Sequence, residues 1–529
     1  MARKKTKREG GGAAVPAPPA GSPVAVIELG TSAIRLAIAE WTGKGEPVTL
    51  ESLQRGVALG KDTFTKGYIE QETTEACVRV LRDFRRVLDE YRIGDDGGLI
   101  AVATSAVREA ANRDAVLDRI YIGTGIDVQA IDEAEVNRYT FLAVRAAFNA
   151  MPALRRGDTL AFEVGAGSTE LLPFHDGQMS TSHTHRLGAL RLRERLAEDG
   201  LSHARQAEVM RTQIERSIAL LRNQMEMEKI THLLALGGDA RFAASLLLPE
   251  WEPRKGGTLD VGALSKLAEE TLRMTTDRTV SRFHLSYPEA ETLGPALLIC
   301  EQLARALKAP CLHVGNTTLR DGLLAELVSG GRWAEDFKRE IVNSARELGR
   351  KFRFEQDHAE YVADVATRLF RALQAEHQLS PRYELLLNVA ALLHDVGLFI
   401  SNRSHHKHSM YVIGNSEIFG IGRRDLMLVS LVARYHRRAM PRPTHTTYAM
   451  LDRRDRITVQ KLAAILRVAD ALGRGGLTRS RRPEIRVEPE QIELRLSHAG
   501  DLTMEEQALR EKAQMFERVY GMKVVLRRS

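Results

Sequence analysis

Short apolar runs alternate with longer amphipathic stretches from residue 24 to about residue 150, and this alternation predicts strands separated by helices. The predicted strands are Val24–Glu28, Ile34–Glu40, Gly98–Ala103 and Ile126–Ile131. The predicted helices are Thr73–Tyr91, a short helix opened by a Thr104-Ser105 cap, and Glu133–Ala150. We therefore expect an α/β domain in this part of the chain.

The same pattern begins again with an apolar run at Thr159. Leu233–Asp239 reads as a strand that runs into a Gly-Gly turn, a place where α/β folds often receive a ligand. A later strand, Leu312–Gly315, precedes a helix at Arg320–Ala325. These elements predict a second α/β domain.

Beyond Gly330 the strand pattern gives way to long helical patterns. His358–Ala375, Pro381–Asp395 and Leu426–His436 are the clearest of them. The last part of the chain returns to strands, at Glu484–Leu496 and Met522–Arg527, around a helix. We expect an all-α domain followed by a small α/β segment. The predicted divisions are a basic tail at 1–23, α/β domains at 24–150 and 151–330, a helical domain at 331–478 and the small segment at 479–529.

Charge and composition add little to this picture. The formal net charge is +7, and residues 1–23 hold five Lys or Arg against one Glu among several Gly and Pro, so we expect a disordered tail. Either a solvated tail or an arm that attracts polyanions fits its composition.

Three distant cysteines argue against a disulfide framework and fit a reducing cytoplasm. No apolar run approaches the roughly 18 residues that span a membrane, and the basic start is not followed by the apolar core of a secretory signal.

Two Gly/Ser/Thr turns carry the candidate chemistry. In Glu28–Arg35 and in Glu163–Leu171, an apolar strand ends in a carboxylate, followed by glycine, small residues and a second strand. Such turns expose N–H groups and hydroxyls that suit phosphate oxygens. Two copies predict two lobes that face one another across a phosphate-binding cleft.

Ordered short motifs give the chain a resemblance to the exopolyphosphatase / guanosine pentaphosphate phosphohydrolase (Ppx/GppA) family. The motifs are the two turns, Ala103–Ala110, Leu236–Gly238 and Leu319–Leu323, together with the helical domain. The resemblance implies two actin-like (sugar kinase/actin superfamily) domains, an all-α domain of the HD metal phosphohydrolase type, and a homodimer. It also implies release of terminal phosphate from inorganic polyphosphate and/or guanosine pentaphosphate (pppGpp), and it implies polyphosphate or guanosine penta/tetraphosphate as the partner.

The family's functional positions transfer to this chain residue by residue. The resemblance implies that one phosphate is held by Gly30, Thr31 and Ser32, a second by Gly165, Gly167, Ser168 and Thr169, and that Arg108 faces the polyanion. It assigns catalytic carboxylates to Glu28 and Glu163, which orient water or Mg²⁺ for in-line attack.

The predicted cleft departs from the family pattern at its acids. Glu28 and Glu163 stand where the family has aspartate, which adds a methylene to each. The family's catalytic glutamate, in a Gly-x-Glu-Glu-Ala-Arg run, falls on Val136, and valine cannot move a proton. A slip of one residue would let Glu135 serve as the catalytic acid. Alternatively, Glu133 and Glu135 are solvated first-turn acids that the helix dipole favours.

The helical domain carries the ligands of an H…HD…D metal site. The resemblance assigns metal binding to His358, His394, Asp395 and Asp470, and four more histidines crowd the same region: His405, His406, His408 and His436. Imidazole and carboxylate together suit Mn, Fe, Co, Ni or Zn, and aspartate can bridge two metals. A metal-free hydrogen-bond network is the alternative reading.

Three functions follow from these observations. The first is a phosphoanhydride hydrolase that acts in the cleft with Mg²⁺. The second is a metal-dependent nucleotide phosphohydrolase in the helical domain, with the cleft as a sensor. The third is a regulator that binds polyphosphate or an alarmone without turnover. None of them calls for a membrane or a specific nucleic acid as partner.

Overall fold

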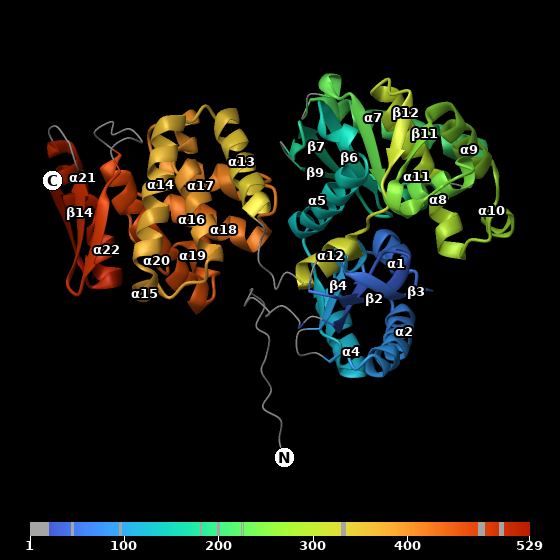
Figure 1. The fold of residues 1–529 in the computed structure, drawn as a ribbon, viewed down its shortest axis with the longest axis horizontal. Helices are drawn as coiled ribbons and strands as arrows, with labels where there is room; N and C mark the ends of the chain where they lie inside the picture. The colour runs from blue at the N-terminus through green and yellow to red at the C-terminus, as the bar shows by residue number, and fades with distance from the viewer. Residues whose placement is uncertain are drawn as a thin grey trace, which may run out of the picture. The chain divides into compact units, whose positions relative to one another are not determined.

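The computed structural model divides the chain into two compact units, with the division between residues 333 and 334. Figure 1 shows the elements of both units in chain order. The structure describes residues 19, 21–43, 47–94, 98–179, 182–197, 202–223, 225, 227–328, 335–473, 482–496 and 502–528. The predicted tail and the predicted boundaries at 330 and 478 lie outside these residues, except that the first strand already begins at Ser22.

The first sheet of the first unit has the strand order β3-β2-β1-β4-β5. Its strands are β1 (Ser22–Leu29), β2 (Ala33–Trp41), β3 (Val48–Gly56), β4 (Leu99–Ala103) and β5 (Val128–Ala130). The first three strands are antiparallel, whereas β4 and β5 run parallel to β1. The carboxyl ends of β1, β4 and β5 therefore meet at one edge, beside the turn that joins β1 to β2.

The second sheet repeats this plan, with the order β11-β12-β10-β6-β7-β8 and β9 paired to β7. Its strands are β6 (Asp158–Val164), β7 (Thr169–His175), β8 (Gln178–Met179), β9 (His183–His185), β10 (His232–Leu236), β11 (Gly257–Asp260) and β12 (Cys311–Val314). An antiparallel hairpin, β6-β7, again stands beside parallel strands, β10 and β12. The second Gly/Ser/Thr turn thus takes the same place in its sheet as the first turn does.

Helices cover the two sheets. They are α1 (Leu59–Lys66), α2 (Gln71–Glu90), α3 (Ser105–Glu109), α4 (Arg113–Thr124), α5 (Glu133–Ala150), α6 (Ala189–Ala197), α7 (His203–Arg222), α8 (Gly238–Leu247), α9 (Val261–Arg273), α10 (Thr276–Phe283), α11 (Tyr287–Ala306) and α12 (Leu319–Val328). One core joins the first sheet to α2 and α4, and a larger one joins the second sheet to α7, α9 and α11. In a third cluster, α12 packs on α5 and β1, so the end of this unit's chain returns to its first strand (Figure 1).

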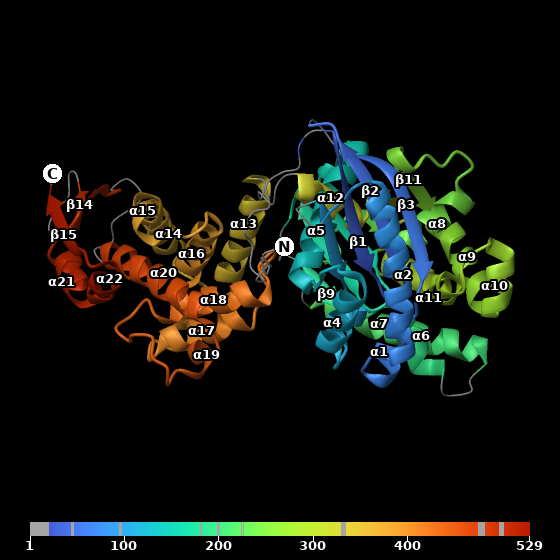
Figure 2. The ribbon, with the colours of Figure 1, turned by 90° about the horizontal axis from the view of Figure 1, so that it is seen from below.

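The second unit is mainly helical (Figure 2). Its helices are α13 (Glu335–Lys351), α14 (Gln356–Ala372), α15 (Gln374–His377), α16 (Arg382–Leu393), α17 (His405–Gly414), α18 (Arg423–Arg434), α19 (Thr446–Ala449), α20 (Arg453–Leu472), α21 (Thr503–Lys512) and α22 (Gln514–Tyr520), with a 3₁₀ turn η4 (Val396–Phe399). Mutual packing of α14, α16, α18 and α20 places the helix ends that carry the predicted metal ligands around one centre.

A small sheet ends the second unit, with the order β13-β14-β15. Its strands are β13 (Glu484–Glu488), β14 (Gln491–Leu496) and β15 (Lys523–Arg528). The residues expected to form strands at Glu484–Leu496 form an antiparallel hairpin, with its turn at Pro489-Glu490. Proline lacks the N–H that a continuous strand would use. Across the described ranges, every helix is too short or too polar to cross a bilayer.

Candidate phosphate site and candidate metal centre

The two Gly/Ser/Thr turns have the same backbone bonding. The Gly30 N–H donates to the Ala33 carbonyl at 3.0 Å, and the Gly165 N–H donates to the Ser168 carbonyl at 2.8 Å. These two amides are therefore committed within their own turns. The tip amides, Thr31 and Ser32 in one turn and Ala166 and Gly167 in the other, make no backbone bond among the described residues. They are the donors that remain for an anion.

Close packing supports each turn from behind. The Gly60 N–H in α1 donates to the Thr31 carbonyl at 2.8 Å, and the Ala189 N–H in α6 donates to the Gly165 carbonyl at 3.0 Å. A Cβ on Gly60 would lie 1.9 Å from the Thr31 side chain, and one on Gly188 would lie 2.3 Å from the Gly167 backbone. Only glycine fits at either position, so these helices fix the turns closely.

The hydroxyl groups near the turns already have partners. The Thr31 and Ser105 hydroxyls lie 3.4 Å apart, and Ser168 donates to the Glu170 carboxylate at 2.7 Å. Thr169 donates to the Leu187 carbonyl and is 1% exposed. The backbone N–H groups at the tips of the turns are thus more accessible to a ligand than the hydroxyl groups on which the resemblance relied.

Glu28, at the end of β1, is held by two arginines. Its Oε2 accepts a hydrogen bond from Arg320 Nη1 at 2.6 Å, and its Oε1 lies 3.8 Å from Arg35 Nη1. Burial alone would raise the pKa of Glu28, but the guanidinium groups of Arg320 and Arg35 outweigh it and hold the pKa below its usual value. Glu28 is therefore ionised and paired at neutral pH.

Glu163, at the end of β6, has the opposite surroundings. Burial, helped by the negative charges of Glu170 and Glu28, raises its pKa to about 7, although Arg241 and Arg320 oppose the shift. Burial also raises the pKa of Asp239, in the first turn of α8, to about 6. This part of the site thus holds more negative charge than its arginines neutralise, which favours a proton or a cation there.

One difference in residue type, at the same register position of the two hairpins, explains the contrast. In the first hairpin Glu28 pairs with Arg35, and in the second Glu163 pairs with Glu170. Opposed residues of an antiparallel pair lie close enough to interact. The first acid therefore faces a cation, and the second faces another acid.

The other predicted site residues lie around the start of α5. Arg108 donates to the Ile131 carbonyl at 3.2 Å and lies 3.6 Å from Glu133, and its charge also acts on Glu170. Glu135 accepts from the Asp132 N–H at 3.1 Å in a capping box. Burial raises the pKa of Glu135.

The structure gives Val136 a packing role. Its side chain lies against the apolar cluster that joins α5, α12 and β1, rather than among polar groups. Its neighbour Glu135 takes part in the capping box, so its carboxylate binds the backbone at the start of α5. The catalytic role suggested for Glu135 stays a prediction.

Arg191, in α6, ties the second hairpin to the first half of the unit. It donates to both oxygens of Glu109 at 2.9 and 2.8 Å, and its Nε donates to the Gly167 carbonyl at 2.8 Å. Its guanidinium also lies 4.2 Å from the centre of the Phe64 ring. Sequence reasoning missed this contact, because the paired residues are 82 positions apart.

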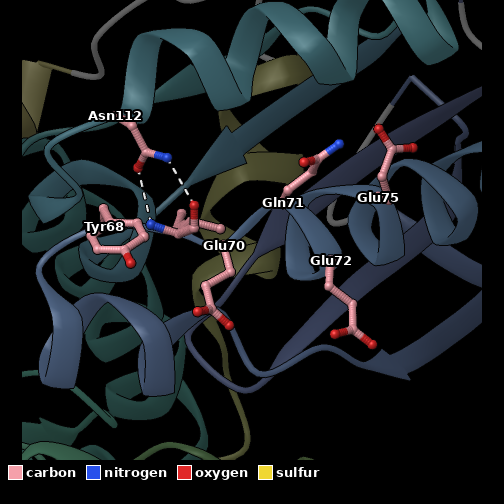
Figure 3. Close-up of a pocket in the computed structure, with 7 residues that line it drawn as sticks. Tyr68, Glu70, Gln71, Glu72, Glu75 and Asn112 are labelled. Atoms are coloured by element: carbon pink, nitrogen blue, oxygen red, sulfur yellow. Dashed lines mark hydrogen bonds between the residues drawn. The ribbon is translucent and has the colours of Figure 1, made fainter.

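A separate cavity of about 730 Å³ lies at the start of α2 (Figure 3). Its lining includes three glutamates: Glu70, Glu72 and Glu75. Asn112 closes one side through hydrogen bonds of 3.0 and 2.8 Å with the Ile69 backbone. Because these carboxylates repel phosphate, we exclude this cavity as the phosphate site.

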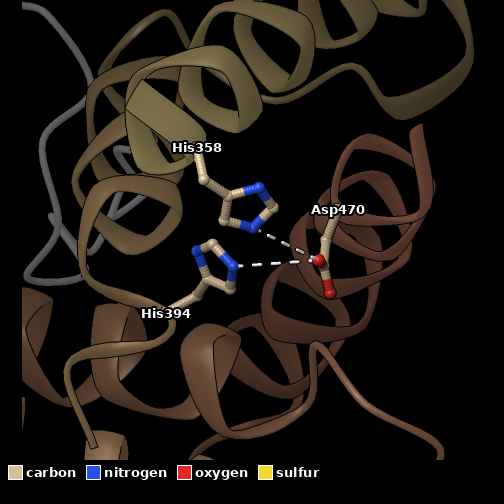
Figure 4. A group of neighbouring side chains, drawn as sticks. All are labelled: His358, His394 and Asp470. Carbon is tan, nitrogen blue, oxygen red and sulfur yellow. Dashed lines mark ion pairs between the residues drawn. The ribbon is translucent and has the colours of Figure 1, made fainter. Parts of the chain in front are cut away.

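The second unit brings the predicted metal ligands together. His358 lies in α14, His394 and Asp395 follow α16, and Asp470 lies in the last turn of α20. The His358 and His394 Nε2 atoms both lie 3.8 Å from Asp470 Oδ1 (Figure 4). Asp395 Oδ2 lies 3.5 Å from His394 Nε2.

Two of the other histidines join this centre. The Nε2 atoms of His405 and His436 lie 3.3 and 3.5 Å from Asp395 Oδ1. Burial lowers the pKa of His436 to about 3 and that of His405 below its usual value, so both are neutral. The sequence placed these histidines only in the region, without a role.

Backbone contacts fix the orientation of three of the rings. His394 and His436 donate from Nδ1 to the carbonyls of Ala391 and Ala433, both at 2.6 Å, and His405 donates to that of Asn402 at 3.2 Å. A carbonyl only accepts, so each of the three rings carries a hydrogen on Nδ1 and turns its Nε2 toward the centre.

The donor set fits a divalent transition metal. The buried atoms His394 Nε2 and Asp395 Oδ1 have no hydrogen-bond partner within the described part of the chain. A Cβ on Gly397 would lie 2.2 Å from the His405 carbonyl, and one on Gly473 would lie 2.7 Å from His358 Cε1. Convergent imidazole and carboxylate groups of this kind suit Mn, Fe, Co, Ni or Zn.

Sequence reasoning also missed Lys512. It lies at the end of α21, and its Nζ donates to Asp470 Oδ2. Burial would raise the pKa of Asp470, but the Lys512 ammonium outweighs it and lowers the pKa. No local pattern marks a lysine 42 residues away as the partner of this acid.

Comparisons with known proteins agree with this architecture. Residues 37–330 match the Ppx/GppA phosphatase family, and residues 342–514 match domain III of the Ppx/GppA phosphatases. Exopolyphosphatase 1 of Mycobacterium leprae is 27% identical over 315 residues, which cover 56% of this chain and 87% of that protein. Exopolyphosphatase 1 of Mycobacterium tuberculosis is 26% identical over 315 residues, which cover 56% of this chain and 86% of its own length.

A solved structure supports the fold. The crystal structure of an exopolyphosphatase from Cytophaga hutchinsonii has a TM-score of 0.52 and 23% identity, and the match covers 59% of this chain and 99% of that one. The first unit thus has the actin-like fold with mixed α/β sheets, and the second unit is the helical C-terminal part. The chain belongs to the Ppx/GppA phosphatase family.

Proposed function

We propose that the first unit hydrolyses phosphoanhydride bonds and releases terminal phosphate from inorganic polyphosphate, with pppGpp as a second substrate. The observation that carries the proposal is Glu163, a carboxyl with a pKa raised to about 7 that stands beside two turns with open backbone amides. The exopolyphosphatases to which the chain is similar support polyphosphate as the substrate class.

The proposed reaction is an in-line attack of water on the terminal phosphorus. Glu163 accepts a proton from the attacking water, the new P–O bond forms, and the bridging P–O bond breaks. A pKa near 7 suits a general base at neutral pH, because both protonation states are populated. We assign Arg320 and Arg108, whose charges act on Glu163 and Glu170, to offset the charge that develops on the phosphate oxygens.

Mg²⁺ fits the carboxylates of this site. Burial raises the pKa values of Glu163, Asp239 and Glu170, and the nearby arginines do not offset it. Hard carboxylate oxygens are the protein ligands that Mg²⁺ prefers. When bound, the ion would neutralise phosphate charge. Glu28 is already paired with Arg320, and we assign it to holding that arginine in place.

Orthophosphate release from polyphosphate and from pppGpp, measured with Mg²⁺, tests this function. We expect release by the unmodified protein and its collapse in Glu163→Ala. Glu72→Ala, which changes an exposed glutamate of α2, is the matched control. Undiminished release by Glu163→Ala would overturn the proposal.

A second candidate function is a metal-dependent phosphohydrolase in the second unit. The observation that favours it is the convergence of histidine Nε2 atoms on the half-buried Asp395 and the buried Asp470, which an HD-type site at His358, His394, Asp395 and Asp470 would use to hold a metal. Metal analysis of the purified protein tests it. We expect at least one transition metal per chain, and its loss in His394→Ala. Less than one transition metal per chain in the unmodified protein would contradict the candidate.

A further inference from the structure

A second pocket, of about 320 Å³, lies on the second unit and shares no residue with the candidate metal centre. Most of its lining comes from two helices: Ile457, Gln460 and Lys461 in α20, and Met515, Arg518 and Val519 in α22. Both sets follow the spacing i, i+3, i+4, which places each on one face of its helix. The two helices pack against one another, and the Tyr520 hydroxyl donates to the Lys461 carbonyl at 3.2 Å. The pocket is therefore built on fixed elements.

Most of the lining is apolar. Ile457 is 40% exposed, so a ligand can reach it from solvent, whereas Met515 is buried. Met440 and Pro441, which follow α18, and Val519 complete the apolar part. Methionine side chains adapt their shape to what they contact. Because pockets for small molecules hold about 300–1,000 Å³, this one suits a ligand with a compact apolar body.

The charged groups of the lining are all cations. Lys461 Nζ donates to the His377 carbonyl at 2.8 Å, and this neutral partner leaves its charge uncancelled. Arg518 is exposed and forms no ion pair within the described part of the chain. Among the described residues that line the pocket, none is acidic. The pocket therefore favours a ligand with negative charge.

A third cation lies behind the lining. The buried Arg467 donates to the carbonyls of Tyr435 and Ala439 at 2.7 and 2.6 Å, and Ala439 directly precedes Met440. Burial lowers the pKa of Arg467 to about 10, so it stays charged at neutral pH. Both of its partners are neutral carbonyls, so its charge adds to that of Lys461 and Arg518.

We propose that this pocket binds a small organic anion, in which an apolar body carries one carboxylate, sulfonate or phosphate group. The apolar body contacts Ile457 and Met515, and the acidic group lies toward Lys461 and Arg518. Inorganic phosphate lacks the apolar body, and an uncharged apolar molecule lacks the acidic group, so each should bind more weakly. The cavity at the start of α2, with its three glutamates, would repel the same ligand.

Fluorescence titration of the full chain with anilinonaphthalene sulfonate tests the proposal, because this dye joins an aromatic body to one sulfonate. We expect saturable binding that is about fivefold weaker in Arg518→Gln, which removes one exposed cation. Ile457→Asp should abolish binding, because it places a carboxylate in the pocket. Arg510→Gln, which changes an exposed arginine of α21, is the matched control and should bind the dye unchanged. The uncharged N-phenylnaphthylamine should bind more weakly than the dye and be insensitive to Arg518→Gln.

Two outcomes would overturn the proposal. Equal affinity for the dye in the unmodified protein, Arg518→Gln and Ile457→Asp would show that the dye binds elsewhere. Displacement of the dye by an equal concentration of inorganic phosphate would show that the apolar lining makes no contribution. Circular dichroism melts of each variant establish that lost binding does not reflect a lost fold, and both substituted side chains are exposed.

Discussion

Replacing Glu163 with Gln should change how the stability of the first unit depends on pH. In the folded protein the pKa of Glu163 is about 7, against an ordinary value of 4.5. Between these values the folded state binds the proton more strongly than the unfolded state does. This contribution to stability is therefore fully present below pH 4.5 and is lost as the pH rises through 7.

The magnitude follows from the size of the shift. The rise in pKa from 4.5 to about 7 corresponds to roughly 3 kcal/mol of unfolding free energy, at about 1.4 kcal/mol for each pKa unit. Glu163 is only half-buried, so solvent screening reduces the expected effect to about 1–2 kcal/mol. Between pH 5 and pH 8 the unmodified protein should lose that much more unfolding free energy than Glu163→Gln does.

Tryptophan fluorescence during urea unfolding is the suitable assay. The three tryptophans of the chain, Trp41, Trp251 and Trp333, all precede residue 334, so the signal reports on the first unit. Glu72→Gln controls for the chemistry of the substitution. The electrostatic reasoning is refuted if the unmodified protein and Glu163→Gln lose the same free energy between pH 5 and pH 8.

Three other substitutions test single contacts. Arg320→Ala should cost about 2–3 kcal/mol because it leaves Glu28 without its closest cation; an unchanged urea midpoint would contradict this. Arg191→Ala removes the ion pair with both carboxylate oxygens of Glu109 and should speed amide hydrogen exchange in α3 and α6. Unaltered exchange would show that this ion pair does not stabilise the two helices. Lys512→Met should destabilise the metal-free second unit by about 3 kcal/mol, and less with Mn²⁺ present, as followed by circular dichroism. A melting temperature equal to that of the unmodified protein would rule out the stabilising role of this lysine.

Local sequence patterns were sufficient for the elements that frame both sites. The strands on either side of each turn are apolar and buried, and glycine and small residues mark the turn between them. Helix α5 spans the predicted Glu133–Ala150, because Asp132 and Glu135 form a capping box at its start. Such signals lie within a few residues of one another, so they can be read without the tertiary structure.

Contacts between residues far apart in the chain could not be inferred from local sequence patterns. Glu28 and Arg320 are 292 positions apart, and no periodicity links them. The β3 strand is exposed and polar along much of its length, so it lacks the apolar run that marked the buried strands. The raised pKa of Glu163 depends on burial and on the negative charges of Glu170 and Glu28, which only the fold brings together.

The most direct test of the proposed function measures polyphosphate binding and hydrolysis together in Glu163→Gln, which preserves the shape of the side chain. If Glu163 is the general base, the variant should bind polyphosphate as the unmodified protein does but release orthophosphate at least about a hundredfold more slowly. Equal rates of release by the two proteins would contradict the account.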